Sequence, residues 1–198
     1  MTMPAGRPLV ALGLVLAFLA AGCLGGNAPT RFYVLAPGEM AALGGTGALT
    51  VGLGPVGLAG YLDRPQIVTR PAADKIDIGE FDQWGEPLRE GITRVLAEDL
   101  ARLMPSARIS VFPWRSLDQV RYHIVVDVTR LDGPGGGDLA LEARWRILDG
   151  AGKEMAAKTT RLTEPTGGAG YSPTVSAMSR ALAALSREMA QALAALPQ

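Results

Sequence analysis

The longest apolar run of the chain covers residues 9–21 and lies behind a single basic residue, Arg7. A helix that crosses a bilayer needs about 20 apolar residues. This run has only 13 and ends in small residues, as secretory signal peptides do. The sequence therefore predicts that residues 1–22 are a removed signal peptide, so that folding is left to the residues that follow.

The predicted signal ends at the only cysteine of the chain, Cys23. The segment Leu19-Ala20-Ala21-Gly22-Cys23 resembles a bacterial lipobox, in which lipid is attached to the cysteine sulfur and to the new amino terminus. An ordinary secretory signal with an incidental cysteine is the alternative. Residues 23–30 would form a short lipidated tether, followed by one domain over residues 31–198. Since seven extended residues reach about 25 Å at most, that domain would stay close to its membrane.

The composition after the signal indicates one nearly neutral domain without internal disulfides. Removal of residues 1–22 leaves 176 residues, the size of one domain, with 18 basic and 19 acidic side chains. A chain of this size can bury about 70 % of its unfolded surface. One cysteine permits no disulfide within the chain, and the near-zero net charge provides no electrostatic surface for nucleic acid. We therefore expect no nucleic-acid partner.

Runs of alternating or β-branched residues predict eight strands. The clearest are the last three, because Leu139 to Leu148 alternates strictly between apolar and polar residues and the turns on either side are glycine-rich. These three strands predict an antiparallel meander. The predicted strands are Arg31–Ala36, Leu49–Val56, Gln66–Arg70, Lys75–Phe81, Ile109–Phe112, Tyr122–Arg130, Leu139–Leu148 and Lys153–Thr163.

Two stretches carry apolar residues at helical spacing. The first begins near Glu86, with Pro87 at the first helical position, and is stopped by Pro105. The second begins with Ser172 as the expected N-cap and continues to Leu196, with alanines beside its apolar stripe. The order of strands and helices predicts an α+β fold, with a mostly antiparallel sheet and two main helices packed on it.

The hexapeptide Gly52-Leu53-Gly54-Pro55-Val56-Gly57 matches the pattern G-x-G-x-x-G after a strand. A dinucleotide-binding turn also needs a helix to begin there. Here Pro55 interrupts the motif, and the next stretch is broken by Pro65. We therefore predict a glycine-marked strand bend or a close backbone approach and no cofactor.

Catalytic and metal chemistry find little support in the sequence. His123, the only histidine, shares a predicted strand face with Asp127, but the chain has no G-x-S-x-G elbow for a nucleophile. One histidine and one lipidated cysteine leave zinc without its usual ligands. We predict no catalytic, cofactor or metal site.

Two further features suggest contacts with other molecules. Arg144 and Arg146 share a strand face and could hold a phosphate, although cross-strand salt bridges with residues such as Glu142 or Glu154 explain them as well. Trp114, which follows Pro113 in a predicted loop, could anchor a partner.

Taken together, these stretches resemble the ABC-type transport auxiliary lipoprotein family, of the paraquat-inducible protein C type. The resemblance covers nearly the whole predicted domain, and its most specific piece is the run that begins Tyr61-Leu62-Asp63-Arg64-Pro65. Other matching stretches are Arg31–Leu35, Val51–Val56, Phe81 with Trp84–Leu88, Val95–Leu100, Pro113-Trp114, Val125–Val128, Glu142–Trp145 and Ala177–Leu193.

The resemblance implies a non-enzymatic outer-membrane lipoprotein that faces the periplasm and assists an MCE-domain protein in lipid transport between membranes. It also implies a homo-oligomeric ring. Only Cys23, as the lipidation site, transfers residue by residue, and Leu24 after it agrees with sorting to the outer membrane. We name Trp114, Tyr61 and Arg64 as candidate partner contacts. The alternatives are a structural envelope lipoprotein that binds peptidoglycan or a cell-wall enzyme, and a tethered hydrolase.

Overall fold

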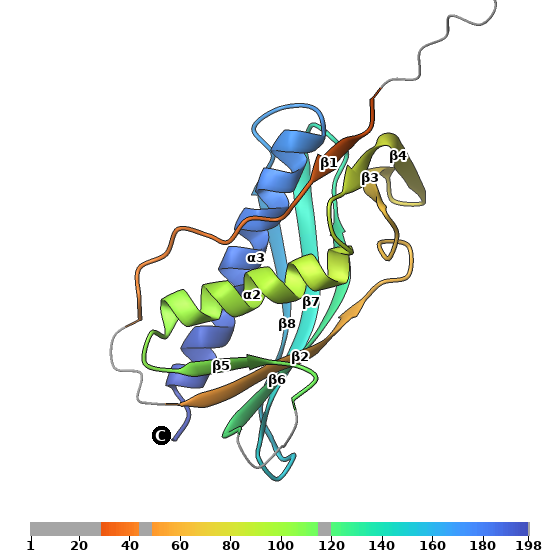
Figure 1. The fold of residues 1–198 in the computed structure, drawn as a ribbon. Coiled ribbons are helices and arrows are strands. Elements are labelled where there is room, and N and C mark those ends of the chain that lie inside the picture. The colour runs from red at the N-terminus through yellow and green to blue at the C-terminus, as the bar shows by residue number, and fades with distance from the viewer. Residues whose placement is uncertain (1–28, 44–48, 115–119, 198) are drawn as a thin grey trace, which may run out of the picture.

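The computed structural model describes residues 29–43, 49–114 and 120–197. Cys23 and the predicted signal peptide lie outside the described residues. The described part contains two helices and eight strands in two sheets, which confirms the predicted α+β class (Figure 1). The elements are β1 (Arg31–Tyr33), β2 (Thr50–Leu58), β3 (Gln66–Ala72), β4 (Lys75–Trp84), α2 (Leu88–Leu103), β5 (Arg108–Val111), β6 (Tyr122–Asp132), β7 (Asp138–Asp149), β8 (Glu154–Pro165) and α3 (Tyr171–Ala194).

The larger sheet has the strand order β5-β2-β6-β7-β8. Its long strands β6, β7 and β8 form the predicted antiparallel meander, in which Val126 lies opposite Trp145 and Trp145 opposite Lys158. The alternation within β7 places its apolar residues in the core, whereas Arg144 and Arg146 are exposed on the other face. The buried members of β7 are Leu139, Leu141, Ala143, Trp145 and Ile147.

The position of β2 differs from the predicted simple arrangement. β2 runs parallel to both of its neighbours, β5 and β6, so the sheet is mixed at this end. Parallel neighbours require a crossover, and the chain provides one through α2 before it returns as β5. Antiparallel pairing still dominates the meander.

The sequence predicted one sheet, but three of the strands form a separate sheet in the order β1-β4-β3. Its strand β1 runs parallel to the end of β4, with Tyr33 opposite Trp84. The buried carboxylate of Asp82 accepts two hydrogen bonds from Arg31, at 2.8 and 2.7 Å, and one from the Tyr33 hydroxyl at 2.7 Å. These bonds hold the first strand, and thus the end of the predicted tether, on the domain.

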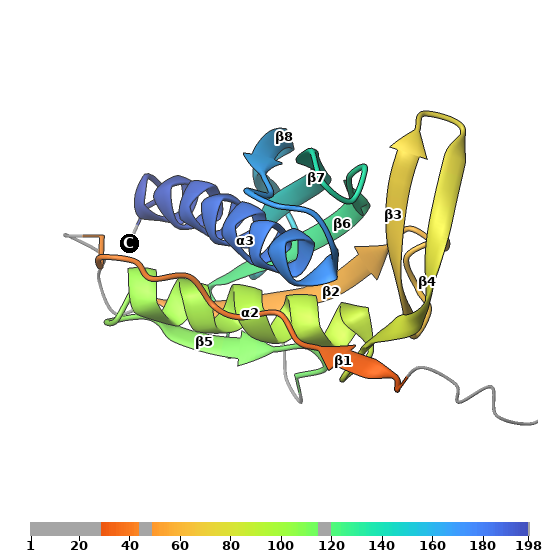
Figure 2. The same cartoon turned by 90° about the horizontal axis from the view of Figure 1, so that it is seen from above.

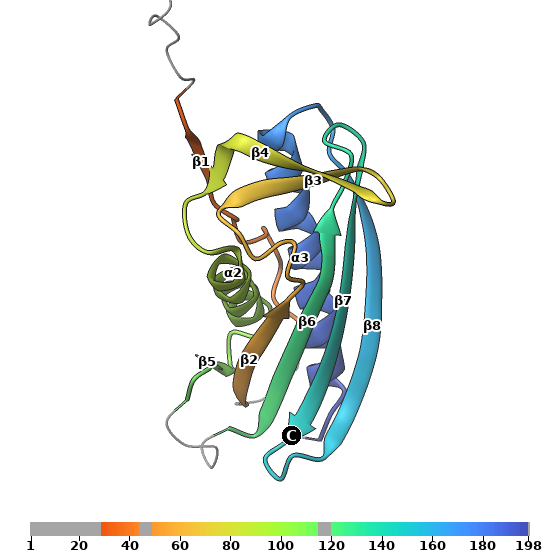
Figure 3. The same ribbon diagram turned by 90° about the vertical axis from the view of Figure 1, so that its right-hand side faces the viewer.

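Helices α2 and α3 cover one face of the larger sheet, and the other face of the meander is open to solvent (Figure 3). The apolar stripe of α2 is buried at residues such as Ile92, Leu96 and Leu100. The alanines of α3 let it approach closely, since Ala177, Ala181 and Ala190 are fully buried beside its larger apolar residues. The core therefore lies between the sheet and these two helices.

Residues 35–43 form a strap that crosses the two helices, seen in orange along α2 in Figure 2. This strap pairs with no described strand and is held by hydrogen bonds to the helices instead. The Gly38 amide donates to Asp99 Oδ1 at 2.9 Å, and the Leu43 amide donates to the Leu103 carbonyl at 2.7 Å. The Asp99 carboxylate is fully buried and also accepts a hydrogen bond from Ser186 at 3.3 Å.

Several predicted boundaries were wrong. Ser172 is not the N-cap of α3, because the helix begins at Tyr171 after Gly170, whose φ of 95° ends the preceding loop. Helix α2 begins at Leu88, one residue after Pro87, which was the predicted first helical residue and is instead the N-cap. β1 ends at Tyr33 instead of continuing to residue 36, because the chain there leaves β4 to become the strap.

No helix within the described ranges is long and apolar enough to cross a membrane.

Candidate functional site

The glycine-rich end of β2 closes around the residues that follow β5. Gly54 has a φ of 114°, and a Cβ added there would lie 2.8 Å from Cβ of Phe112. A Cβ on Gly52 would lie 3.1 Å from the Trp114 ring. The pairing of β2 with β6 shifts register between Leu53 and Val56. These observations confirm the predicted strand bend and close approach.

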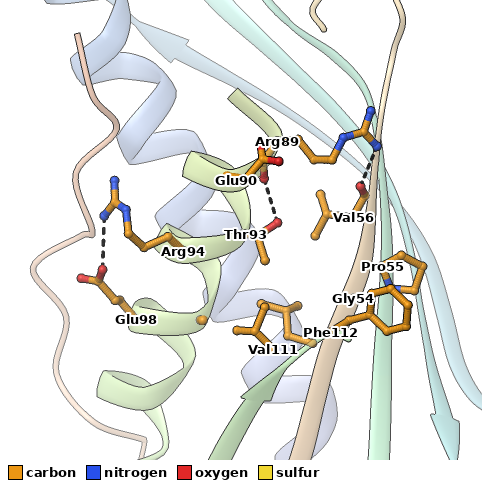
Figure 4. A pocket seen from close by; sticks show the side chains of 12 residues that line it. Gly54, Pro55, Val56, Arg89, Glu90, Thr93, Arg94, Glu98, Val111 and Phe112 are labelled. Atoms are coloured by element: carbon orange, nitrogen blue, oxygen red, sulfur yellow. Dashed lines mark hydrogen bonds and ion pairs between the residues drawn. The ribbon is translucent and has the colours of Figure 1, made fainter. Parts of the chain in front are cut away.

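Beside this bend, a groove of about 560 Å³ runs between α2 and the strands β2 and β5 (Figure 4). This volume lies within the range of small-ligand and peptide pockets. Val111 and Phe112 line it and keep 43 % and 49 % of their surface exposed, which places them among the most exposed large apolar residues described. The other apolar lining residues are Leu53, Pro55, Val56 and Ala97.

The helical rim of the groove carries Arg89, Glu90, Arg94 and Glu98. Glu90 is exposed and forms no ion pair with a described residue, whereas the other three are paired. Arg94 contacts Glu86 at 2.6 Å and Glu98 at 3.2 Å. Arg89 donates to the Val56 carbonyl at 3.2 Å, across the groove from α2 to β2 (Figure 4). The rim is thus electrically balanced, and the groove favours an apolar occupant.

The groove is bordered by a sheet edge that no described strand pairs with, because β5 is the last strand of its sheet on that side. The amides of Arg108 and Phe112 donate to the carbonyls of Leu49, just before β2, and of Leu53 in β2. Since alternate residues of a strand direct their backbone groups to opposite sides, those of Ile109 and Val111 face away from β2. An extended peptide could pair with this edge and place a side chain in the groove.

A second pocket, of about 370 Å³, joins two of the sequence stretches that carried the family resemblance. One wall is the turn Asp63-Arg64-Pro65 and the other is the segment Trp84–Leu88, which leads into α2. The Arg64 Nε is buried and makes no hydrogen bond to the described protein. Its guanidinium group therefore lines a pocket without a protein partner in the described ranges.

Tyr61 belongs to a buried ionic cluster at the start of the same turn. Its hydroxyl donates to Asp132 Oδ2 at 2.5 Å, and the Arg70 guanidinium lies 4.9 Å above its ring. The fully buried Asp132 also forms ion pairs with Arg70 and Arg130, each at 3.0 Å. Burial, together with the hydrogen bond to Asp132, raises the pKa of Tyr61 to about 12. Its hydroxyl is therefore committed within the domain.

Trp114 is half-buried beside Gly52 of β2. Its ring centroid lies 5.2 Å from that of Phe112 in an edge-to-face contact, and 5.2 Å from the His123 ring. Trp114 thus packs against the ring of the exposed Phe112. Burial lowers the pKa of His123, so this histidine packs in neutral form.

The three candidate contacts fall into two places. Trp114 lies behind the groove, whereas Tyr61 and Arg64 belong to the turn at the second pocket. Their role in partner binding stays a prediction. Sequence reasoning missed the groove itself, although two apolar residues at the end of a short strand, Val111 and Phe112, were a usable signal.

Arg144 and Arg146 remain exposed on the outer face of the meander, where the expected salt bridges are not seen. Neither forms an ion pair with another described residue, and Glu142 instead contacts Arg161 at 3.9 Å. Asp127 lies directly opposite Arg144 on β6, so the face is not purely basic. Among the residues that the structure places, no group of three or more acidic, histidine or cysteine side chains could hold a metal ion.

Comparison with known proteins identifies the family. The model of the family described as ABC-type transport auxiliary lipoprotein component matches residues 33–190. No curated protein matches the chain.

Two solved structures share the fold. A crystal structure of an uncharacterized protein has a TM-score of 0.71 and 19 % identity over 83 % of this chain and 98 % of its own. A Xanthomonas campestris protein of the DUF330 family has a TM-score of 0.68 and 13 % identity over 81 % of this chain and 92 % of its own. A PelC dodecamer from Paraburkholderia phytofirmans is more distant, at a TM-score of 0.46 and 14 % identity over 81 % of this chain and 96 % of its own, and carries no argument here.

The family match takes in β2, α2 and β5, which build the groove, and also the turn after β2 and the end of β4, which line the second pocket. This chain belongs to the ABC-type transport auxiliary lipoprotein family.

Proposed function

We propose that this protein is a non-catalytic lipoprotein of the outer membrane that faces the periplasm and docks an MCE-type lipid transport assembly. The observation that carries the proposal is the family match over residues 33–190, preceded by a lipobox cysteine eight residues before β1. An auxiliary component needs an anchor and a docking surface, and the chain offers a candidate for each.

The anchor limits what the domain can reach. The tether between Cys23 and Arg31 spans about 25 Å when fully extended, and the ion pair between Arg31 and Asp82 holds β1 on the body of the domain. A domain held this closely cannot cross to the opposite membrane. It must instead be met by a long partner, which an MCE assembly provides.

The docking surface is the groove beside β5. Val111 and Phe112 expose apolar surface there, and the free backbone groups of Ile109 and Val111 accept an extended segment. Backbone pairing would supply affinity, and the groove would supply side-chain specificity. We assign this groove to an extended apolar segment of the MCE-domain protein.

The test is photo-cross-linking in intact cells, with the cross-linking amino acid placed at position 112 or, as a control, at Thr159. Thr159 is exposed on β8, on the outer face of the meander. We expect position 112 to give an adduct with an MCE-domain protein and position 159 to give none. An adduct of equal strength at both positions, or none with an MCE protein, would contradict the proposal. An adduct between two copies of this chain would show that the groove is a subunit interface of the implied ring.

The anchor is tested separately by Cys23→Ser. We expect the native protein to carry acyl chains by mass spectrometry and to fractionate with the outer membrane, and the variant to be released. A native protein with an unmodified thiol would overturn the anchor. Retention of the Cys23→Ser variant on peptidoglycan would favour the structural-lipoprotein alternative.

A further inference from the structure

The two most exposed large apolar residues of the described chain lie in β1 and directly after it, close to the end of the predicted tether. Phe32 has 66 % of its surface exposed and Val34 has 58 %. The strand alternates, so Tyr33 and Leu35 turn inward while Phe32 and Val34 turn outward. An outward apolar pair nine residues after a lipidated cysteine lies within reach of the bilayer that holds the lipid.

This apolar pair adjoins the second pocket. The Gly85 amide donates to the Tyr33 carbonyl at 2.7 Å, and a Cβ on Gly85 would lie 3.1 Å from Cγ1 of Val34. Gly85 also lines the pocket, together with Trp84 and Arg64. The exposed apolar side chains and the pocket therefore form one continuous surface.

The charges around the pocket leave one cation unneutralised. Two carboxylates line it, but Asp63 is paired with Arg89 at 2.6 Å and Glu86 with Arg94 at 2.6 Å. Arg64 forms no ion pair with the described residues, and its buried Nε makes no hydrogen bond to them. A guanidinium group in this state is suited to hold a phosphate by two parallel hydrogen bonds.

The start of α2 adds to the same positive potential. The helix begins at Leu88 in the pocket wall, its N-cap residue Pro87 provides no side-chain hydrogen bond, and the first amide with a partner inside the helix is that of Gly91. The unpartnered amides of a first helical turn carry partial positive charge and favour anions.

We propose that β1 and the second pocket form a membrane-contact face, in which Phe32 and Val34 enter the headgroup region and the pocket takes the phosphate of a phospholipid. The inference rests on the lipid anchor of the proposed function, since the tether is what brings this face to a bilayer. Apolar side chains and a cationic group on one surface are the pattern of proteins that lie on membranes. This contact would orient the domain relative to its membrane.

The membrane test uses the full lipidated protein in nanodiscs of two compositions. One contains phosphatidylethanolamine with a minority of phosphatidylglycerol, and the other contains digalactosyldiacylglycerol, which has no phosphate. We expect hydrogen exchange of the amides at residues 88–90 to be several-fold slower in the phospholipid discs. Arg64→Gln should abolish this difference, whereas Arg161→Gln, on the outer face of β8, should preserve it.

The apolar part is tested in the same discs with the double variant Phe32→Ser, Val34→Ser. We expect it to lose the protection of residues 88–90 although its Arg64 is intact. Equal protection in both lipid compositions, or protection that survives Arg64→Gln, would overturn phosphate recognition. Protection that appears only when an MCE-domain protein is added would show that the occupant is a protein and would also overturn the inference.

A second measurement separates this inference from the proposed function. Glycerol 3-phosphate and inorganic phosphate are titrated against the full chain while the Arg64 Nε–H resonance is followed by NMR. A saturable shift with glycerol 3-phosphate supports the pocket even if mass spectrometry finds Cys23 without lipid, in which case only the anchor fails. No shift with either probe, combined with no protection in lipidated discs, would remove the pocket and leave the docking proposal intact.

Discussion

The Arg89 Nη2 atom donates to Asp63 Oδ2 at 2.6 Å and thereby ties helix α2 to the turn between β2 and β3. Arg89 also lines the groove, whereas Asp63 lines the second pocket, so this ion pair stands between the two candidate sites. Its side chains remain 40 % and 46 % exposed. An ion pair this exposed fixes the position of the turn relative to α2 but adds little to the free energy of unfolding.

Asp63→Asn should therefore lower the free energy of unfolding by no more than about 1 kcal/mol, because exposed ion pairs contribute little. Urea denaturation measures this change, and Asp77→Asn, which breaks the exposed pair with Lys75 at 3.4 Å, is the matched control. A loss several times larger for Asp63→Asn than for Asp77→Asn would mean that the turn is a stability element.

Asp132→Ala should be far more costly, because the carboxylate is fully buried and paired with Arg70 and Arg130. Removing one partner of a buried pair costs about 3–5 kcal/mol. We expect the lower end of that range, since the side chain of Arg130 is 37 % exposed and can turn to water. Urea denaturation at neutral pH checks the value, and a cost similar to that of Asp63→Asn would contradict it.

The raised pKa of Tyr61, at about 12, predicts a loss of stability at alkaline pH. The neutral hydroxyl is favoured in the folded state, so its contribution is complete below pH 10, where an unfolded tyrosine begins to ionise. It is lost as the pH rises from about 10 to 12. Ultraviolet titration of tyrosinate should show a late-ionising group that disappears in Tyr61→Phe. If Tyr61→Phe removes a group that ionises near pH 10, the hydrogen bond to Asp132 is not kept in solution.

Asp99 should lower the stability of the folded protein as the pH rises through the acid range. A salt-bridged carboxylate has the opposite effect. Burial raises its pKa above the usual 3.8, despite hydrogen bonds from Gly38 and Ser186. The neutral form is thus favoured in the folded state, and its contribution is present below pH 3.8 and lost as the pH rises through the folded pKa.

Asp99→Asn removes the buried charge and keeps an acceptor for the Gly38 amide. We therefore expect the variant to gain stability relative to the native protein as the pH rises above about 4, where an unfolded aspartate ionises, with little difference at lower pH. Thermal unfolding at several pH values measures the trend. A constant difference across the range would show that Asp99 does not titrate in this interval.

Gly54→Ala should destabilise the bend that supports the groove. A residue with a side chain at a φ of 114° is strained, at about 1–3 kcal/mol, and its Cβ would also lie 2.8 Å from Cβ of Phe112. Gly60→Ala is the control, because no atom lies within 4 Å of a Cβ there. We expect urea denaturation to show a loss for position 54 only, and cross-linking from position 112 to weaken.

The pattern of apolar residues within a single strand or helix was enough to predict that element and its buried face. The alternation of Leu139 to Leu148 predicted both the strand and its buried face, and the apolar spacing of residues such as Ile92 and Leu96 predicted α2. The glycines of the 52–57 motif were correctly interpreted as a close approach, because a phosphate-binding turn needs a helix that does not follow. The starts of helices were harder to predict. Ser172 was the expected N-cap of α3, but Gly170 takes that position and the helix begins at Tyr171.

The sequence by itself determined the signal-like start, the lone cysteine, the α+β class and the faces of the long strands and helices, because side-chain periodicity is a property of each element. Only the tertiary structure decided that β2 lies parallel between β5 and β6, that β1, β3 and β4 form a separate sheet, and that Asp63, Arg64 and Leu88 share a pocket. Periodicity states which face of a strand is buried but not which strand lies beside it. That choice depends on contacts between residues far apart in the chain, and both candidate sites are built from such contacts.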